Sequence, residues 1–182
     1  MCLHRKILKP DGSGKDIQNP LEILHATESE QLNFSRHISK LTTFYKALDP
    51  EAESTEVTDF TNLLTEFYES IGLTPLVNGV ERQISGLPPT SYPIFSEFLE
   101  YLNKRITEIT EKEYNKAEMV IAEEKLKTLY KITRHISSLI KTYGNMFNGH
   151  STINNIMDEQ IVVINISGLK DMAQNVFAAQ MT

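Results

Sequence analysis

The segment Gly12-Ser-Gly-Lys15 is the part of the sequence that comes nearest to a nucleotide-binding motif. A phosphate-binding P-loop needs a further glycine five residues before the second one, and a Ser or Thr after the lysine to bind magnesium. Lys9 stands where that glycine is required, and Asp16 follows the lysine, where its carboxylate would repel a phosphate. The sequence therefore predicts a plain turn here, without an ATP or magnesium site.

The remaining nucleophiles and metal ligands lack the spacing of a site. The five histidines are His4, His25, His37, His135 and His150. They form no His-Glu-x-x-His motif, and the single Cys2 rules out a Cys-x-x-Cys zinc motif. No Gly-x-Ser-x-Gly elbow presents a serine nucleophile, and nothing near Cys2 would activate its thiol. Asp158-Glu159 precedes a strand, whereas a Walker-type acidic pair lies at a strand's C-terminal end. We expect no catalytic, cofactor-binding or metal-binding residue, and we expect His135 to be a solvated helix residue.

One feature could bind a partner: a basic stripe on the last predicted helix. Its members share one face at helical spacing; they are Lys127, Lys131, Arg134 and Lys141. The simplest interpretation is a solvated helix face. The alternatives are contact with an acidic protein partner, ion pairing with the acidic second helix, and contact with a nucleic-acid backbone. A net charge of −6 argues against a dedicated nucleic-acid binder.

Hydrophobic periodicity predicts that helices make up most of the chain. The expected helices run from after Thr27 to Asp49-Pro50, over 57–71 with Gly72 as the stop signal, from about Ile94, and from about Lys112 to Tyr143 before Gly144-Asn145. A loop of turn-forming residues is expected over 74–93, and the stretch between Lys46 and Arg82 has no basic residue.

The same periodicity predicts which side chains form the core. The first two helices would bury Leu32, Ile38, Leu41, Tyr45 and Leu48, then Val57, Phe60, Leu63, Leu64, Phe67, Tyr68 and Ile71. The last two would bury Phe95, Phe98, Leu99, Leu102 and Ile106, then Leu129, Ile132, Ile136, Leu139, Ile140 and Tyr143. We expect the second helix to pack against the fourth.

The two ends of the chain have a different character. Gln160–Ile166 is a β-branched run of the kind found in strands covered on both faces, and Ser167-Gly168 then leads into a further helix. Arg5–Leu8 is a candidate short strand that would pair near it. The expected fold is mainly α, a helical bundle-like subdomain with short strands at the two ends of the chain. We divide it into an extended segment 1–24, a helical subdomain 25–145, and a loop, strand and truncated helix 146–182.

Composition indicates an ordinary globular protein. Hydrophobic residues make up 40% of the 182 positions and charged residues 23%. The single cysteine cannot form an internal disulfide, which favours a reducing compartment. No apolar run approaches the roughly 18–20 residues of a membrane span, and the N-terminus lacks the apolar stretch of a signal peptide. We therefore expect a cytoplasmic location.

Three segments together resemble a known family. They are Ile17-Gln-Asn-Pro-Leu-Glu-Ile23, Phe147-Asn-Gly-His150, and Ile161–Lys170 with Asn175–Met181. The chain is similar to the motor ATPases of conjugative type IV secretion, the VirB/TrbE/CagE-type enzymes of the RecA-like group that includes HerA and FtsK. The similarity is strongest over the last 40 or so residues, and the helical middle resembles the family only in helix content and position.

This resemblance implies that the chain is the piece between the two ATP motifs of such an enzyme. In the family, Walker A lies upstream of the Asn-Pro-Leu segment and Walker B downstream of the final helix, with a helical subdomain inserted between them in a RecA-like α/β core. No position here matches the catalytic residues, so none is carried over. ATP and magnesium would belong to the parent protein.

The leading hypothesis is thus a helical insertion subdomain of a secretion ATPase that powers DNA or protein transfer, inactive alone. Its partners would be the rest of the parent and other secretion-system components, at the inner face of the cytoplasmic membrane without insertion. We also expect the 160–182 strand region to self-associate or to hide against the chain's own helices. The alternative is a free-standing helical adaptor that binds a protein partner.

Overall fold

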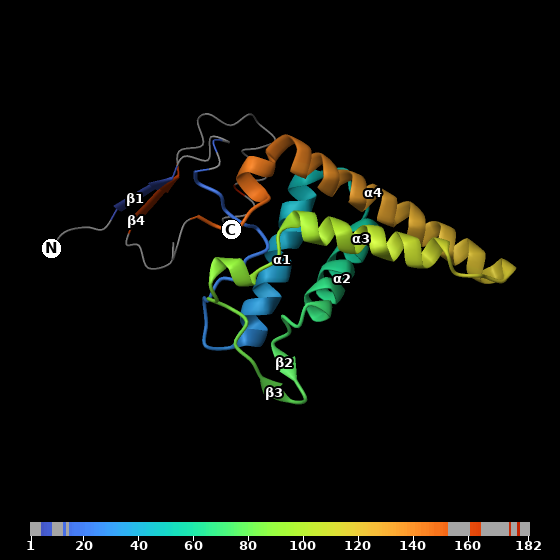
Figure 1. The fold of residues 1–182 in the computed structure, drawn as a ribbon, viewed down its shortest axis with the longest axis horizontal. Helices are drawn as coiled ribbons and strands as arrows, with labels where there is room; N and C mark the ends of the chain where they lie inside the picture. Colours follow the sequence, from blue (N-terminus) through green and yellow to red (C-terminus); the bar gives the residue numbers. More distant parts are fainter. Residues whose placement is uncertain are drawn as a thin grey trace.

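The structure is a computed structural model that describes residues 13 and 15–152, the backbone of 5–8 and 161–164, and positions 175 and 178. Four helices account for most of the described chain, which confirms the expected mainly α fold (Figure 1). They are α1 (Glu30–Leu48), α2 (Ser54–Ser70), α3 (Phe95–Thr110) and α4 (Lys116–Phe147). Within this part of the chain, no helix combines the length and apolar character needed to cross a membrane.

The start of α1 is fixed by two side chains, one of them distant in sequence. Ser29 is the N-cap and accepts a hydrogen bond from the backbone N–H of Leu32 at 3.4 Å. Glu81 adds its carboxylate, which accepts from the backbone N–H groups of Glu30 at 2.8 Å and Gln31 at 3.2 Å. A carboxylate is stabilising here because it meets the unpaired N–H groups and the positive end of the helix dipole. The sequence pattern predicted a start directly after Thr27, but the helix begins at Glu30, so Glu28 lies before it.

The boundaries predicted for α4 were wrong at both ends. The helix begins later, at Lys116, because Asn115 caps it by accepting hydrogen bonds from the N–H groups of Ala117 and Glu118. It also continues beyond Gly144 to Phe147. Tyr143 departs from helical geometry, with φ −129°, so the helix is kinked where the sequence pattern predicted its end. Its last turn then places Met146 and Phe147 in the core.

The expected loop over 74–93 contains a small antiparallel hairpin and a 3-10 turn that the sequence pattern did not reveal. Strands β2 (Leu76–Val77) and β3 (Val80–Glu81) are joined by Asn78-Gly79, where both residues have positive φ. Asn-Gly is the favoured pair for a two-residue hairpin turn of this kind. The hairpin projects from the bundle, and it carries Glu81 to the start of α1 (Figure 1).

The two ends of the chain meet as adjacent strands, as expected. β1 (Arg5–Leu8) pairs in parallel with β4 (Ile161–Ile164), in the register Arg5↔Ile161 to Leu8↔Ile164. The rest of the predicted strand, and the helix predicted after it apart from positions 175 and 178, lie outside the described residues. The whole helical section therefore lies within the connection between two neighbouring parallel strands.

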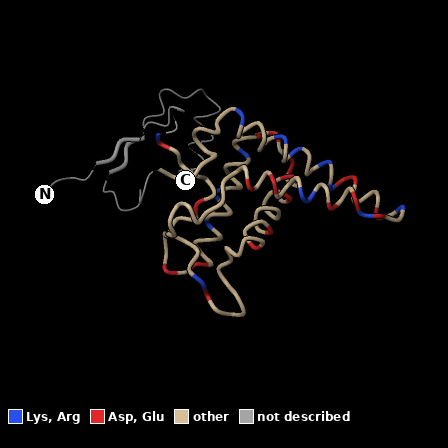
Figure 2. Tube along the Cα trace, viewed as in Figure 1, with Lys and Arg blue, Asp and Glu red and all other residues tan. Residues whose placement is uncertain are grey.

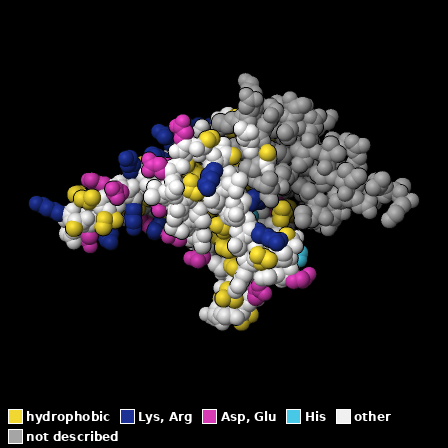
Figure 3. All heavy atoms as spheres, turned by 180° about the vertical axis from the view of Figure 1, so that it is seen from behind, with side chains coloured by type: hydrophobic (Ala, Val, Ile, Leu, Met, Phe, Trp, Pro, Cys, Tyr) yellow, Lys and Arg dark blue, Asp and Glu magenta, His cyan; other side chains and the backbone are white. Residues whose placement is uncertain are grey.

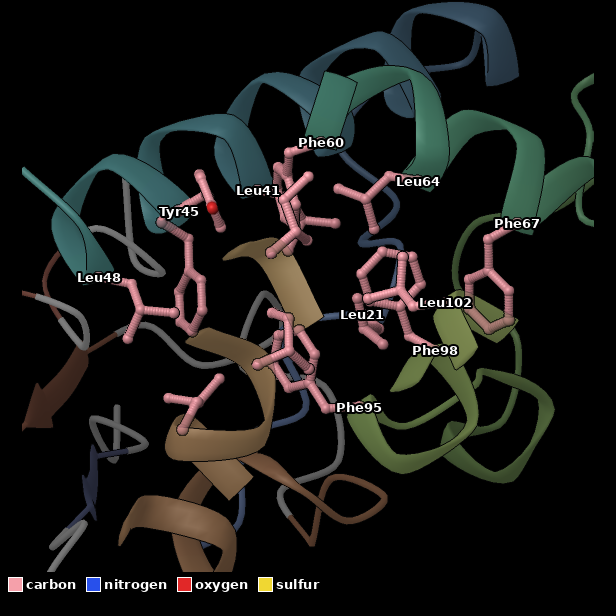
Figure 4. Close-up of a cluster of buried hydrophobic side chains, with 14 of the residues drawn as sticks. Leu21, Leu41, Tyr45, Leu48, Phe60, Leu64, Phe67, Phe95, Phe98 and Leu102 are labelled. Carbon is pink, nitrogen blue, oxygen red and sulfur yellow. The ribbon is translucent and has the colours of Figure 1, made fainter. Parts of the chain in front are cut away.

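One apolar core joins all four helices (Figure 4). Its largest fully buried side chains are aromatic, and among them Tyr45 stacks on Phe60 with ring centroids 4.1 Å apart. Phe67, which is 3% exposed, has its ring centroid 5.2 Å from that of Phe98. Most of the predicted core is buried or half-buried, and α2 does pack against α4. Two predictions were wrong, since Leu32 is 44% exposed and Ile71 is 45% exposed. Ile71 lies just beyond the last residue of α2. Leu32 lies nine positions before Leu41, about 180° around α1 from it, so its side chain points away from the core.

Candidate functional site

The basic stripe does not form one continuous charged face in the structure. Lys127, Arg134 and Lys141 are exposed on α4. Figure 2 shows that basic and acidic residues are interspersed along this helix. Lys131 differs, because its ammonium group lies 3.2 Å from Glu56 Oε2 and its side chain is only 39% exposed. Ion pairing with the acidic second helix was one of the alternatives drawn from the sequence, and it is confirmed for Lys131.

Glu56 is the centre of a polar joint between α1, α2 and α4. Its side chain is 4% exposed, and each carboxylate oxygen has a donor: the Tyr45 hydroxyl at 2.6 Å from Oε1 and Lys131 Nζ at 3.2 Å from Oε2. Burial, followed by the hydrogen bond to Glu56, raises the pKa of Tyr45, so its hydroxyl keeps its proton and remains a donor. The buried carboxylate is thus paired, as a buried charge must be.

His135 belongs to the same joint, so the expectation of a solvated residue was wrong. Its Nε2 lies 3.3 Å from Asp49 Oδ2, and its ring packs edge-on against Tyr45 with centroids 6.2 Å apart. Asp49 is the residue that ends α1. Lys131 and His135 are four residues apart and so share a helix face. That spacing was visible in the sequence. The contact between the turn after α1, which contains Asp49, and this face of α4 was not.

The joint offers three possible metal ligands, but a cation already occupies it. Oxygen and nitrogen atoms of Asp49, Glu56 and His135 lie within 4.8 Å of one another. The Lys131 ammonium lies against Glu56, however, and both Glu56 oxygens accept hydrogen bonds. A metal ion would have to displace Lys131, so this arrangement is a structural joint that fixes three helices.

A second buried centre brings together a serine, a histidine and a glutamate. Ser85 Oγ donates to Glu30 Oε1 at 2.8 Å, accepts from Asn33 Nδ2 at 3.1 Å and lies 2.9 Å from His25 Nδ1. In a catalytic triad the histidine lies between the serine and the acid, as the base that accepts the serine proton. Here Ser85 itself lies between them and is 0% exposed. Glu30 also accepts from the backbone N–H groups of Ile84 and Ser85. This network anchors the loop that follows β3 and leaves no reachable nucleophile.

The P-loop-like segment lies at the surface where it is described. Lys15 is exposed, and its carbonyl oxygen accepts from Thr152 Oγ1 at 2.7 Å. Gly12, Gly14, Cys2, His4 and the acidic pair at 158–159 lie outside the described residues.

Two of the segments that carry the family resemblance lie side by side. The backbone N–H of Asn19 donates to Ser151 Oγ at 3.0 Å, and that of Gln18 donates to the Met146 carbonyl at 3.1 Å. Gly149 packs so closely on Ile17 that a Cβ there would lie 3.1 Å from its Cδ1. The Asn-Pro-Leu segment and the chain after α4 thus form one junction at the base of the helical section.

Side chains anchor the Asn-Pro-Leu segment to other parts of the core as well. Asn19 Nδ2 donates to the Pro93 carbonyl at 2.8 Å, and Asn19 Oδ1 accepts from the N–H of Leu21 at 3.0 Å. The Tyr68 hydroxyl donates to the Leu21 carbonyl at 2.7 Å and contacts His37 Nε2 at 2.7 Å. Leu21 is 0% exposed, so the segment passes through the core of the helices.

Comparison with known proteins gave a sequence relative and a structural neighbour, and no family model matches the chain. An uncharacterised protein of Bacillus anthracis, pXO2-09, is 33% identical over 172 residues, which cover 90% of this chain and 25% of that protein. The structure of VirB4 of Thermoanaerobacter pseudethanolicus matches with a TM-score of 0.69 and 18% sequence identity. The match covers 96% of this chain and 41% of the VirB4 chain. The chain therefore spans about a quarter of the curated relative, and at 18% identity the VirB4 match establishes a shared fold.

Proposed function

We propose that this chain, which has the fold of a section of VirB4, is a helical insertion subdomain of a type IV secretion ATPase that powers DNA or protein transfer. ATP and magnesium would be bound by the parts of the parent protein that flank it, and the chain alone would be inactive. The fold match agrees with the family that the sequence resembles, and the relative's name places it with the plasmid pXO2.

The parallel pairing of β1 with β4 carries this proposal. Parallel neighbouring strands belong almost only to α/β sheets whose faces are covered by helices. Here the connection between them runs from residue 9 to residue 160 and contains α1, α2, α3 and α4. A free-standing helical adaptor has no need of such a strand pair. An insertion between two strands of a larger sheet accounts for it, and the junction at Asn19 and Ser151 closes the base of that insertion.

The helical section would have a structural role and would bind other proteins. In its two polar centres Glu56 is paired with Lys131, and Glu30 accepts hydrogen bonds around the buried Ser85. The exposed cations of the stripe are Lys127, Arg134 and Lys141. We propose that these residues contact other components of the secretion machinery at the cytoplasmic face of the membrane, outside the bilayer. The parent protein's remaining domains would be its first partners.

A chimera tests the proposal directly. This chain replaces the matching quarter of the Bacillus anthracis relative, and ATP hydrolysis is measured for the relative, for the chimera and for the isolated chain. The proposal predicts hydrolysis by the relative and by the chimera and none by the isolated chain. In a third version, residues 25–145 of the chimera are replaced by a short Gly/Ser linker. Its activity shows whether ATP hydrolysis requires the helical section or only the strands. A relative that does not hydrolyse ATP would contradict the proposal.

A further inference from the structure

The outer end of the α3–α4 hairpin is exposed and apolar. Helix α4 extends well beyond α2 (Figure 1), and three consecutive residues there, Met119, Val120 and Ile121, are 53%, 59% and 59% exposed. Figure 3 shows hydrophobic side chains at this free end, among side chains of both charges. Consecutive helix residues point about 100° apart, so this end of α4 is apolar over much more than one stripe. A helix that only faces water needs no such surface.

One face of this end combines an apolar centre with opposite charges on either side. Glu118, Ile121 and Lys125 are spaced by three and four residues, so they lie on the same face of α4. One carboxylate oxygen of Glu118 accepts from the N–H of Asn115, which completes the helix cap. Among the described residues Lys125 has no ion-pair partner within 4.0 Å.

The same face leads inward to a groove where α2 diverges from the hairpin. The groove has a volume of about 250 Å³, and Lys125 lies on its wall. Its apolar lining comes from all three helices: Leu63 of α2, Ile109 of α3 and Leu129 of α4. The core-facing side of α4 therefore continues outward past the point where α2 stops covering it.

We propose that this surface binds a second copy of the chain, with the two α4 helices antiparallel and crossing beside Ile121. In that arrangement Ile121 of one copy packs on the same region of the other. Glu118 of each copy then faces Lys125 of its partner, because both residues lie within four positions of Ile121 on opposite sides. The pattern is self-complementary, as a two-fold interface between identical chains requires.

The charge distribution favours a second copy over the other kinds of partner. Acidic and basic residues are interspersed along the end of the hairpin (Figure 2). A nucleic-acid backbone would require clustered Lys and Arg, and a strongly acidic or basic protein would require the opposite charge. A surface with opposite charges on the two sides of an apolar centre fits a partner in which the order of these charges is reversed. An antiparallel copy of the same helix provides that order.

Reciprocal charge reversal tests this contact in the full chain. Glu118→Lys places two lysines against each other at both ends of the contact, and Lys125→Glu places two glutamates there. By sedimentation velocity, we expect the natural sequence to dimerise and each variant to raise the dimer dissociation constant about tenfold, the order expected when two exposed pairs become repulsive. An equimolar mixture of the two variants restores both attractive pairs, so we expect it to dimerise like the natural chain.

Two controls separate this contact from other causes. Val80→Glu introduces the same kind of charge at a 65% exposed apolar residue on β3 and should leave the dimer unchanged. Circular dichroism of Glu118→Lys shows whether the loss of the Glu118 cap lowers the helix content. If it does, recovery of dimerisation in the mixture of the two variants still shows that the charged pairs are in contact. A natural chain that stays monomeric would overturn the proposal, as would variants that associate equally well alone and mixed. The latter result would place the association elsewhere, for example at the terminal strands.

Discussion

The backbone N–H of Asn19 lies 3.0 Å from Ser151 Oγ, so the segment that leads into the helical section is bonded directly to the segment that leaves it. The two residues are 132 positions apart. Such a contact fixes the base of the helices where they return to the β1–β4 pair. The helical section therefore leaves the strands and returns to them at one place. The segment that enters it and the segment that leaves it both contribute side chains to the core.

The Asn19 side chain should be essential to anchoring the Asn-Pro-Leu segment in the core. Asn19→Ala removes the donor to the Pro93 carbonyl and the acceptor of the Leu21 N–H, and leaves both groups buried without a partner. Each such group costs about 1–3 kcal/mol, so we expect a loss of about 2–4 kcal/mol in the free energy of unfolding, measured by urea titration. Asn103→Ala, at an exposed position of α3, should change it by about 0.5 kcal/mol or less. Equal effects of the two changes would mean that the two side-chain hydrogen bonds of Asn19 add nothing to stability.

The contrast between Phe67 and Ile71 tests the corrected boundary of the core. Phe67 is 3% exposed and its ring lies 5.2 Å from that of Phe98 and 5.3 Å from that of Tyr101. Phe67→Ala should lower the free energy of unfolding by about 3–5 kcal/mol, as large core truncations do. Ile71→Ala should cost about 0.5 kcal/mol or less because the side chain is 45% exposed. A large loss from Ile71→Ala would restore the original expectation that this residue is in the core.

Lys131 and Lys127 separate the structural part of the basic stripe from its exposed part. Lys131→Met keeps the apolar stem but leaves the buried Glu56 carboxylate without its cation. Breaking a fully buried pair costs about 3–5 kcal/mol; because Lys131 is 39% exposed, we expect about 1–2 kcal/mol. Lys127→Met should be nearly neutral by thermal and urea unfolding. If the two variants are equally stable, the ion pair does not contribute to the joint.

Lys40 should give the folded chain a characteristic pH dependence. Burial lowers the pKa of its ammonium group to about 8, against the attraction of Glu22, which raises it. The unfolded chain binds this proton up to about pH 10.4. Between these values the unfolded state holds more protons than the folded one, so Lys40 makes the free energy of unfolding rise with pH from about 8 to about 10.

The Lys40→Met variant should lack this rise and be more stable than the natural chain at pH 7. Urea titrations of the two proteins across pH 7–10, compared as a difference, isolate the contribution of Lys40 from that of other groups. Lys46→Met, at an exposed position of the same helix, is the matched control. A natural chain and a Lys40→Met variant with parallel pH profiles would show that the ammonium group is fully hydrated in the folded state.

The helices and most of the core could be predicted from the sequence because each depends on local periodicity. Stop signals were less dependable: Gly144-Asn145 looked like the end of α4, yet packing of Met146 and Phe147 holds one more turn in place. The β2–β3 hairpin was missed because its strands are two residues long, too short for alternation to appear. Only the Asn78-Gly79 turn was there to reveal it.

Ion pairing of the basic stripe with the second helix was one alternative drawn from the sequence, and Lys131 makes such a pair. The rest of the polar joint could not be predicted because it depends on tertiary contacts. Lys131 and His135 share a face, which the sequence shows, but their partners Glu56 and Asp49 are distant in sequence. Nothing local indicates that the turn between α1 and α2 meets α4. The junction of the Asn-Pro-Leu segment with the chain after α4 was hidden for the same reason, although the resemblance had already singled out both segments.

Calorimetric titration with Mg-ATP tests the central claim, that nucleotide binding belongs to the flanking parts of the parent and not to this chain. We expect no heat of binding for the isolated chain, because Lys9 and Asp16 stand where a P-loop requires glycine and Ser or Thr. We expect binding once the chain is placed within the Bacillus anthracis relative. A micromolar dissociation constant for the isolated chain that is lost on Lys15→Ala would contradict the claim.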